Sequence, residues 1–222
     1  MDWPSASRGE HRWLFVLLYR LYETLTLEDA PEPAGLIFVL AGRMERKQYG
    51  IELYRSGVAP RLLLSVGRFE VSRMRAIDFA KADELIALRD RTAPQERHFF
   101  CDMTASGICI ERPKLCRWNT YGEVLGLRTQ LARGLPKVLI VISTDVHLRR
   151  IAMTVDRVFR GIPLEVRYCP VPPRYSSLRK AEWWTRPADR RYVLTELAKL
   201  QAYRVILCLP DWMIRWIMRL KS

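Results

Sequence analysis

Short apolar runs alternate along the chain with stretches whose apolar residues recur at helical spacing. The apolar runs lie at 36–40, 61–66, 99–103, 108–111, 137–142 and 164–169. Several are bounded by glycine, and the clearest are rich in Val, Ile and Leu, which is typical of buried strands. Strands that alternate with helices indicate βαβ units. The pattern therefore predicts an α/β fold with a mostly parallel sheet and flanking helices.

The intervening helices are predicted from apolar spacing and from their stop signals. One helix passes through 49–54 and ends before Gly57, and a partial apolar face over 71–88 predicts a second. A third starts at 119–120 and ends at Gly134, and a fourth covers 148–159 with Gly161 as its stop. A long helix is expected over 192–207. The segment 170–187 is rich in proline, serine and basic residues and is predicted to be a surface loop.

The length of 222 residues fits one compact domain with terminal extensions. We expect an N-terminal helical extension over 1–34, an α/β core over 35–170, and a C-terminal loop and helices over 171–222 that pack on the core. The apolar run 13–19 is interrupted by Arg20 and is shorter than the ~18 residues that span a bilayer. No small-residue cleavage site follows it. A cytoplasmic protein is the default expectation, with peripheral membrane contact as a variant of it.

The net charge of +13, from 37 basic and 24 acidic residues, favours acidic partners. Phosphorylated small molecules, anionic lipid and nucleic acid all qualify. Nucleic acid is the weakest of these predictions, because the basic residues are dispersed and no recognised binding motif accompanies them. We therefore expect an anionic small-molecule ligand as the main partner.

A cationic amphipathic helix is predicted after Pro210. One face of it carries apolar residues and the other two arginines: Trp212, Met213, Trp216, Ile217 and Leu220 against Arg215 and Arg219. Such a helix can lie on an anionic membrane. A terminal helix more often docks its apolar stripe on its own domain, and both possibilities stay open at this point.

Several kinds of site are not predicted. The five cysteines are an odd number without a CxxC pair, so neither a disulfide framework nor a zinc site is indicated. No second histidine stands at metal-binding spacing. The motifs GxSxG, GxGxxG and GxxxxGK[ST] are absent. We expect no metal, no serine hydrolase triad and no classical dinucleotide or P-loop site, and the cofactor stays unknown.

The strongest candidate site follows the strand at 137–142, where polar residues open the next helix. Ligands bind at such strand ends in α/β proteins. Ser143, Thr144 and Arg150 are predicted ligand-binding residues. His147 is a candidate to move a proton or to bind an anion when charged. Asp145 either orients that ring or caps the helix, and we place both residues in the catalytic group.

Other strand ends add further candidates. Gly42 and Gly67 end strands where the backbone turns or approaches a ligand closely. The ligand-binding candidates beside them are Arg43, Arg46, Ser65 and Arg68. The arginines are suited to carboxylate or phosphate. The alternative is that the glycines only permit turns and the arginines are solvated.

Two carboxylates and one polar pair complete the set. Glu70 and Glu111 are each candidates to act as a general base or to bind ligand hydroxyls, and we place Glu70 in the ligand-binding group and Glu111 in the catalytic group. Isolated carboxylates are more often surface or salt-bridged residues. Asn119 and Thr120 either cap their helix or place an amide and a hydroxyl in the cleft.

The order of these motifs resembles a known bacterial family. The matching segments are 39–42, Arg46, 52–67, 119–120 and 142–150, which resemble the YdcF/SanA/ElyC-type family built on a domain of unknown function. The resemblance implies a Rossmann-like three-layer sandwich with a ligand cleft at the strand C-termini. Several members are associated with cell-envelope homeostasis. This chain has Ala41–Gly42 where the family usually has two glycines, and it lacks the N-terminal anchor of many members.

Two functions are therefore compared. The first is binding of an anionic small molecule in the cleft, nucleotide-like or a phosphorylated envelope intermediate, with transferase or hydrolase activity as its extension. The second is a noncatalytic protein that binds membrane or nucleic acid through its basic surface and terminal aromatic helices. The first makes individual site residues essential. The second predicts binding that falls steeply with salt and survives loss of His147.

Overall fold

A computed structural model describes residues 12–113, 120–132 and 134–220 of the chain. Its centre is a six-stranded sheet in the order β4-β3-β2-β1-β5-β6. The strands are β1 (Leu36–Val39), β2 (Leu62–Gly67), β3 (His98–Thr104), β4 (Gly107–Glu111), β5 (Val138–Ser143) and β6 (Glu165–Pro170). β1, β2, β5 and β6 run parallel, whereas β3 and β4 form an antiparallel edge. The predicted α/β class with a mostly parallel sheet is confirmed.

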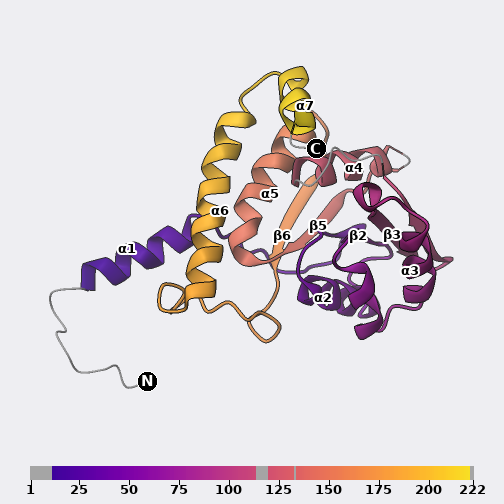
Figure 1. The fold of residues 1–222 in the computed structure, drawn as a ribbon, viewed down its shortest axis with the longest axis horizontal. Coiled ribbons are helices and arrows are strands. Elements are labelled where there is room, and N and C mark those ends of the chain that lie inside the picture. The colour runs from indigo at the N-terminus through magenta and orange to yellow at the C-terminus, as the bar shows by residue number, and fades with distance from the viewer. Residues whose placement is uncertain (1–11, 114–119, 133, 221–222) are drawn as a thin grey trace.

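Helices cover both faces of the sheet (Figure 1). They are α1 (Arg12–Glu23), α2 (Met44–Arg55), η1 (Val71–Ala76), α3 (Ala82–Asp90), η2 (Pro94–Glu96), α4 (Thr120–Leu131), α5 (Asp145–Val158), α6 (Pro187–Ile206) and α7 (Asp211–Leu220). α2, η1 and α3 pack on one face, and α4 and α5 on the other. α6 lies along the outer side of α5, and α1 projects away from the body.

The two cores follow from the alternation of side chains along the strands. In β1, Ile37 and Val39 join the core under α2, whereas Leu36 and Phe38 join the core under α4 and α5. Both faces of a parallel sheet are buried, so its strands read as continuous apolar runs. A third cluster, built around Trp183, joins α1, α5 and α6. The two cores, one on each face of the sheet, give three layers: helices, sheet and helices.

The region predicted as one helix over 71–88 is instead two elements. η1 ends at Ala76, and Ile77 takes an extended conformation before α3 starts at Ala82. Val71, Met74 and Leu85 are all buried in the same core. The apolar spacing predicted the buried positions correctly but not the break, because two short elements can bury the same residues as one helix.

The C-terminal helix does not bury its aromatic stripe. α7 packs on the domain through Ile214, and Trp212 and Trp216 stay exposed. The expectation that the stripe docks on its own domain is therefore not met by these two residues. A helix this short buries only one narrow face, and here that face is not the one with the tryptophans.

Candidate functional site

The carboxyl ends of the parallel strands meet at one edge of the sheet, and the strand order reverses there. β1 leads to β2 on one side, whereas β5 lies on its other side. The crevice outside such a switch point is the usual ligand site of open α/β sheets. Ala41 and Gly42 follow β1, whereas Ser143 ends β5 and Thr144 follows it. The predicted candidates at these two strand ends are thus brought together.

Arg46 on the first turn of α2 lies across this switch point. Its Nη1 donates to the Ala41 carbonyl (2.7 Å) and its Nη2 to Thr144 Oγ1 (2.9 Å). Thr144 Oγ1 is in turn 2.8 Å from the hydroxyl of Tyr192 on α6. The side chain is 4% exposed, and its Nε has no hydrogen-bond partner among the described residues. Gly42 has φ +137°, and a Cβ there would meet Arg46 Nη1 at 2.8 Å.

The neighbouring Lys47 is buried but fully paired. Its ammonium donates to Glu70 and to the Leu40 carbonyl (3.0 Å). Glu70 also accepts the backbone N–H of Gly67 (2.7 Å). Burial lowers the pKa of Lys47, and Glu70 opposes that shift. Glu70 therefore fixes the end of β2 through the backbone of Gly67. Its carboxylate, which was predicted to bind ligand, forms an internal ion pair with Lys47 instead.

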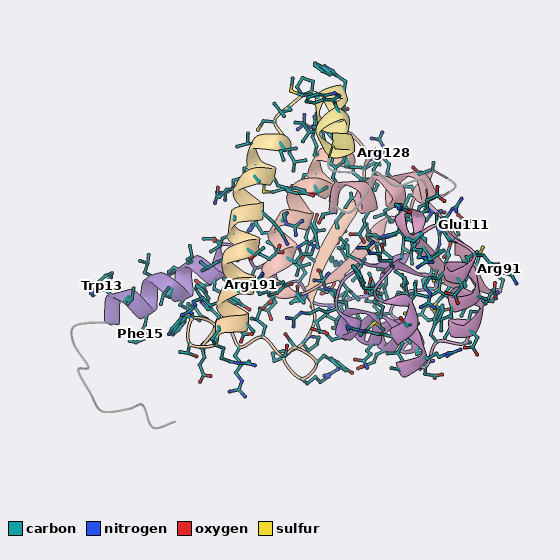
Figure 2. The ribbon with its side chains drawn as sticks, in the orientation of Figure 1. Trp13, Phe15, Arg91, Glu111, Arg128 and Arg191 are labelled. Carbon is teal, nitrogen blue, oxygen red and sulfur yellow. The ribbon has the colours of Figure 1, made fainter. Side chains whose placement is uncertain are left out.

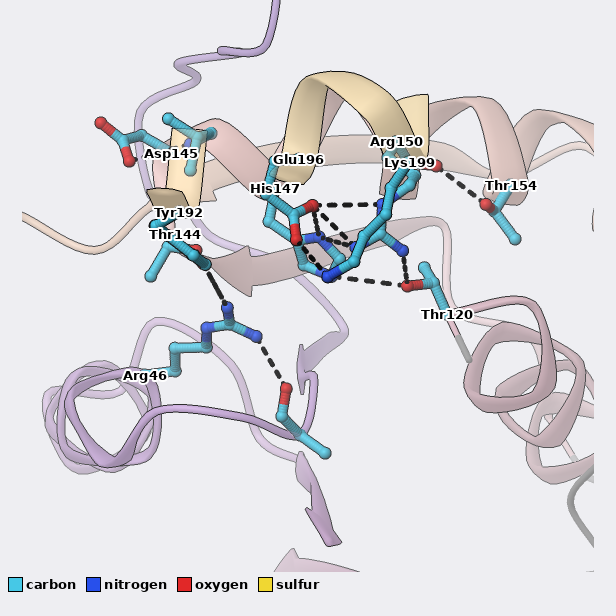
Figure 3. Close-up of polar contacts among 12 residues, drawn as sticks. Arg46, Thr120, Thr144, Asp145, His147, Arg150, Thr154, Tyr192, Glu196 and Lys199 are labelled. Carbon is cyan, nitrogen blue, oxygen red and sulfur yellow. Dashed lines mark hydrogen bonds and ion pairs between the residues drawn. The ribbon is translucent and has the colours of Figure 1, made fainter. Parts of the chain in front are cut away.

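A closed polar network surrounds His147 (Figure 3). Arg150 Nη2 lies 2.7 Å from His147 Nδ1 and 2.8 Å from Glu196 Oε2. Arg150 Nη1 donates to Thr120 Oγ1, and Lys199 donates to Glu196 Oε1 (2.9 Å). Nδ1 of His147 also lies 3.1 Å from Glu196 Oε2, so it faces a guanidinium, which only donates, and a carboxylate, which only accepts. The network joins α4, α5 and α6.

The electrostatics of this network keep His147 neutral. Burial, with the adjacent Arg150 charge, lowers the pKa of His147 to about 3. Burial alone would raise the pKa of Glu196, but the hydrogen bond with His147 and the charge of Arg150 hold it below its usual range. The imidazole is thus buried and neutral, with Nδ1 beside Arg150 and Glu196 and Nε2 3.5 Å from Thr120 Oγ1.

A second polar chain lies beneath the end of β1. The backbone N–H of Ala41 donates to Glu123 Oε1 (2.8 Å), and the hydroxyl of Ser65 donates to the same oxygen (2.5 Å). Ser65 Oγ also lies 2.7 Å from Nε2 of His98. Burial raises the pKa of Glu123 and lowers that of His98 to about 4. This is not a nucleophilic triad, because Ser65 is fully buried and the carboxylate bonds to it rather than to the ring.

Three other candidates border the crevice. Ser143 Oγ is buried and has no hydrogen-bond partner among the described residues. Arg43 donates to Ser177 (2.9 Å) and its guanidinium lies 4.9 Å from the ring centre of Tyr192. Asp145 points away from the His147 network (Figure 3) and accepts the hydroxyl of Tyr22 and the backbone N–H of Val146. It therefore does not orient His147, and burial raises its pKa.

Two predicted residues lie apart from the crevice. Glu111 ends β4, three strands away from β1 and four from β5, or roughly 19 Å from β5 at ~4.8 Å per strand. Its Oε2 accepts from Gln130 (2.6 Å). Arg68 lies over the ring of Phe69 and lines a separate open hollow of about 470 Å³. Asn119 lies outside the described residues.

Sequence reasoning missed five residues of the site: Lys47, His98, Glu123, Tyr192 and Glu196. None of them belongs to a recognisable sequence motif. They lie at the crevice only because the helices and strands that carry them pack together there. Only Glu123 could have been found from the sequence. It lies three residues after Thr120, a predicted cleft residue, in the first turn of α4. Within the described chain, no group of three or more His, Cys, Asp or Glu side chains is placed to hold a metal ion.

No protein-family model matches the chain, and neither a curated protein nor a solved structure matches it. The resemblance to the YdcF/SanA/ElyC-type family therefore stays a prediction.

Proposed function

We propose that the protein binds an anionic small molecule, phosphorylated or nucleotide-like, at the switch point between β1 and β5. The observation that carries the proposal is the buried guanidinium of Arg46. Three basic side chains are buried in the described chain: Arg46, Lys47 and Arg150. Lys47 and Arg150 each have a carboxylate partner. Arg46 forms no ion pair with any described carboxylate, and its Nε is unpartnered.

A buried charge that forms no direct ion pair is costly, because the protein replaces its hydration only in part. An anion from solution removes that cost when it binds, and arginine suits the geometry of phosphate and carboxylate. The unpartnered hydroxyl of Ser143 and the N-terminus of α5, which begins at Asp145, supply further attraction for an anion at the same strand end. A role in envelope homeostasis, drawn from the family resemblance, is part of this proposal.

The test is a thermal-shift and calorimetric titration with inorganic phosphate, pyrophosphate, nucleoside monophosphates, sugar phosphates and polyprenyl phosphate. Sodium chloride at matched ionic strength separates binding from screening of the +13 charge. We compare Arg46→Met with Arg55→Met, which makes the same change at the exposed end of the same helix.

Arg46→Met is expected to weaken binding at least tenfold, as for loss of a charge-assisted hydrogen bond of about 1.5–3 kcal/mol. Arg55→Met is expected to bind as the wild type does. If no anion binds the wild type, or binding survives in Arg46→Met, the proposal is wrong.

A second candidate, noncatalytic binding to an anionic membrane surface, is favoured by exposed aromatic side chains on two helices. Trp13 projects from α1 (Figure 2), and Trp212 and Trp216 on α7 are 68% and 59% exposed. Tryptophan is favoured at the membrane interface, and the net positive charge favours anionic lipid. Among the described residues, no helix is both long and apolar enough to cross a membrane.

Co-sedimentation with phosphatidylglycerol vesicles tests this candidate. The variant Trp212→Ala/Trp216→Ala is expected to reduce binding about tenfold, since each indole buries apolar area in the interface. Phe69→Ala removes an exposed ring from another part of the surface and serves as the control. Equal binding of the two variants, or binding insensitive to salt, would contradict membrane docking through α7.

A further inference from the structure

We propose that Glu123 is the proton-transfer group of this crevice, and that Ser65 and His98 connect it to solvent. The proposal rests on the anionic ligand proposed above. Glu123 and Arg46 contact the same residue of the loop after β1: Glu123 accepts the N–H of Ala41, and Arg46 donates to its carbonyl. A ligand anion beside Arg46 therefore lies close to the Glu123 carboxyl.

The two oxygens of Glu123 have different surroundings. Oε1 is held by the Ala41 N–H and the Ser65 hydroxyl. Oε2 has no hydrogen-bond partner among the described residues, and the side chain keeps 12% of its surface exposed. One oxygen is thus fixed and the other is available to a reacting group. A general base needs this combination of a fixed position and a free lone pair.

The chain behind Glu123 has a defined direction. A neutral His98 donates from Nε2 to Ser65, and Ser65 donates to the Glu123 carboxylate. Because Nε2 already carries a proton in this arrangement, it accepts one from Glu123 only after the ring has exchanged that proton for one on Nδ1 through solvent. Both hydrogen bonds then reverse, and the proton moves from Glu123 through Ser65 to Nε2, while the ring releases its Nδ1 proton to solvent. The His98 side chain is 24% exposed, so its ring reaches solvent while Ser65 stays buried. A fully buried hydroxyl with a partner on each side is suited to this linking role.

The reaction class that fits is hydrolysis of a phosphate ester, or transfer to an acceptor hydroxyl. Water or the acceptor gives its proton to Glu123 Oε2 as its oxygen forms a bond to phosphorus. The bond between phosphorus and the leaving oxygen breaks, and that oxygen takes up a proton from solvent, while the proton on Glu123 leaves through Ser65 and His98. No oxidant or reductant is needed, and Arg46 stabilises the charge on the phosphoryl oxygens.

The experiment measures both binding and turnover. Phosphate release and nitrophenol release are followed with sugar phosphates, nucleoside diphosphates, p-nitrophenyl phosphate and bis(p-nitrophenyl) phosphate. Glu123→Gln keeps an acceptor oxygen for Ala41 and Ser65 but cannot take a proton. Glu84→Gln, a surface carboxylate on α3 paired with Lys81, is the control for loss of one negative charge.

Glu123→Gln is expected to lower kcat at least 100-fold, in the range of general base catalysis, with KM and phosphate binding changed less than threefold. Ser65→Ala is expected to lower kcat less and to shift the pH profile. Turnover within threefold of wild type in Glu123→Gln overturns the proposal. So does the absence of turnover with every ester while phosphate still binds. Loss of phosphate binding in the wild type instead overturns the proposed function itself.

A wild-type pH profile keeps the test open if Glu123→Gln does not fold. The base acts when ionised, so the rate is expected to fall as the pH drops through the pKa of Glu123, which burial raises above 4.5. A rate that shows no acidic limb above pH 4.5 overturns the proposal.

Discussion

The pH dependence of stability gives the sharpest test of the His147 network. The chain has three histidines, and two of them, His98 and His147, lie in the described structure with lowered pKa values. For His147 the pKa falls from 6.5 in the unfolded chain to about 3 in the folded protein. Its contribution to stability is therefore complete above pH 6.5 and is lost as the pH falls from 6.5 towards 3.

The size of the effect follows from these two values. Each pH unit between them is worth about 1.4 kcal/mol, so acidification from about pH 7 to about pH 5 removes roughly 2 kcal/mol of the free energy of unfolding through His147. His98 adds a loss of similar size and the same sign. Glu123 and Asp145, whose pKa values are raised, act in the opposite direction. A comparison of variants separates these contributions.

The assay is urea unfolding of wild type, His147→Gln and His98→Gln at both pH values. Glutamine removes the titrating group and keeps an acceptor for Arg150. The loss of stability between about pH 7 and about pH 5 is expected to be smaller by roughly 2 kcal/mol in each variant than in the wild type. An equal loss in wild type and His147→Gln would mean that the folded protein protonates His147 normally. The assignment of a buried, neutral imidazole to His147 would then be refuted.

Two further predictions concern the same edge of the sheet. Gly42→Ala places a methyl group against Arg46 at a positive φ, and we expect a loss of about 1–3 kcal/mol with weaker phosphate binding. Gly57→Ala, also at positive φ but in open space, is the control: it should lose stability but bind phosphate as the wild type does. Calorimetry measures both the stability and the phosphate affinity. Glu196→Gln leaves Arg150 buried without its carboxylate, and we expect a loss of about 3 kcal/mol in urea unfolding. A loss below about 0.5 kcal/mol would mean that solvent already screens the pair.

Four candidate residues from the segments that follow β1 and β5 lie together in the structure. Gly42, Arg46, Ser143 and Thr144 meet because parallel strands end at the same edge of a sheet, so a strand followed by polar residues predicts a position as well as a residue type. The surroundings of His147 could not be predicted in the same way. Its partner Glu196 is 49 positions away on a helix without any motif.

The sequence by itself determined where the strands and most of the helices lie, because hydrophobic periodicity is a local property. It did not determine the break between η1 and α3 or the buried face of α7. Only the tertiary structure decided that β1 lies between β2 and β5, that α6 packs on α5, and that α4 brings Glu123 to Ala41 across 82 positions. Those choices decide which buried cations have a carboxylate partner. Charge pairing depends on distances of a few ångströms between remote segments, and no local pattern encodes such distances. Arg46 and Lys47 are neighbours in the sequence, yet only one of them is paired.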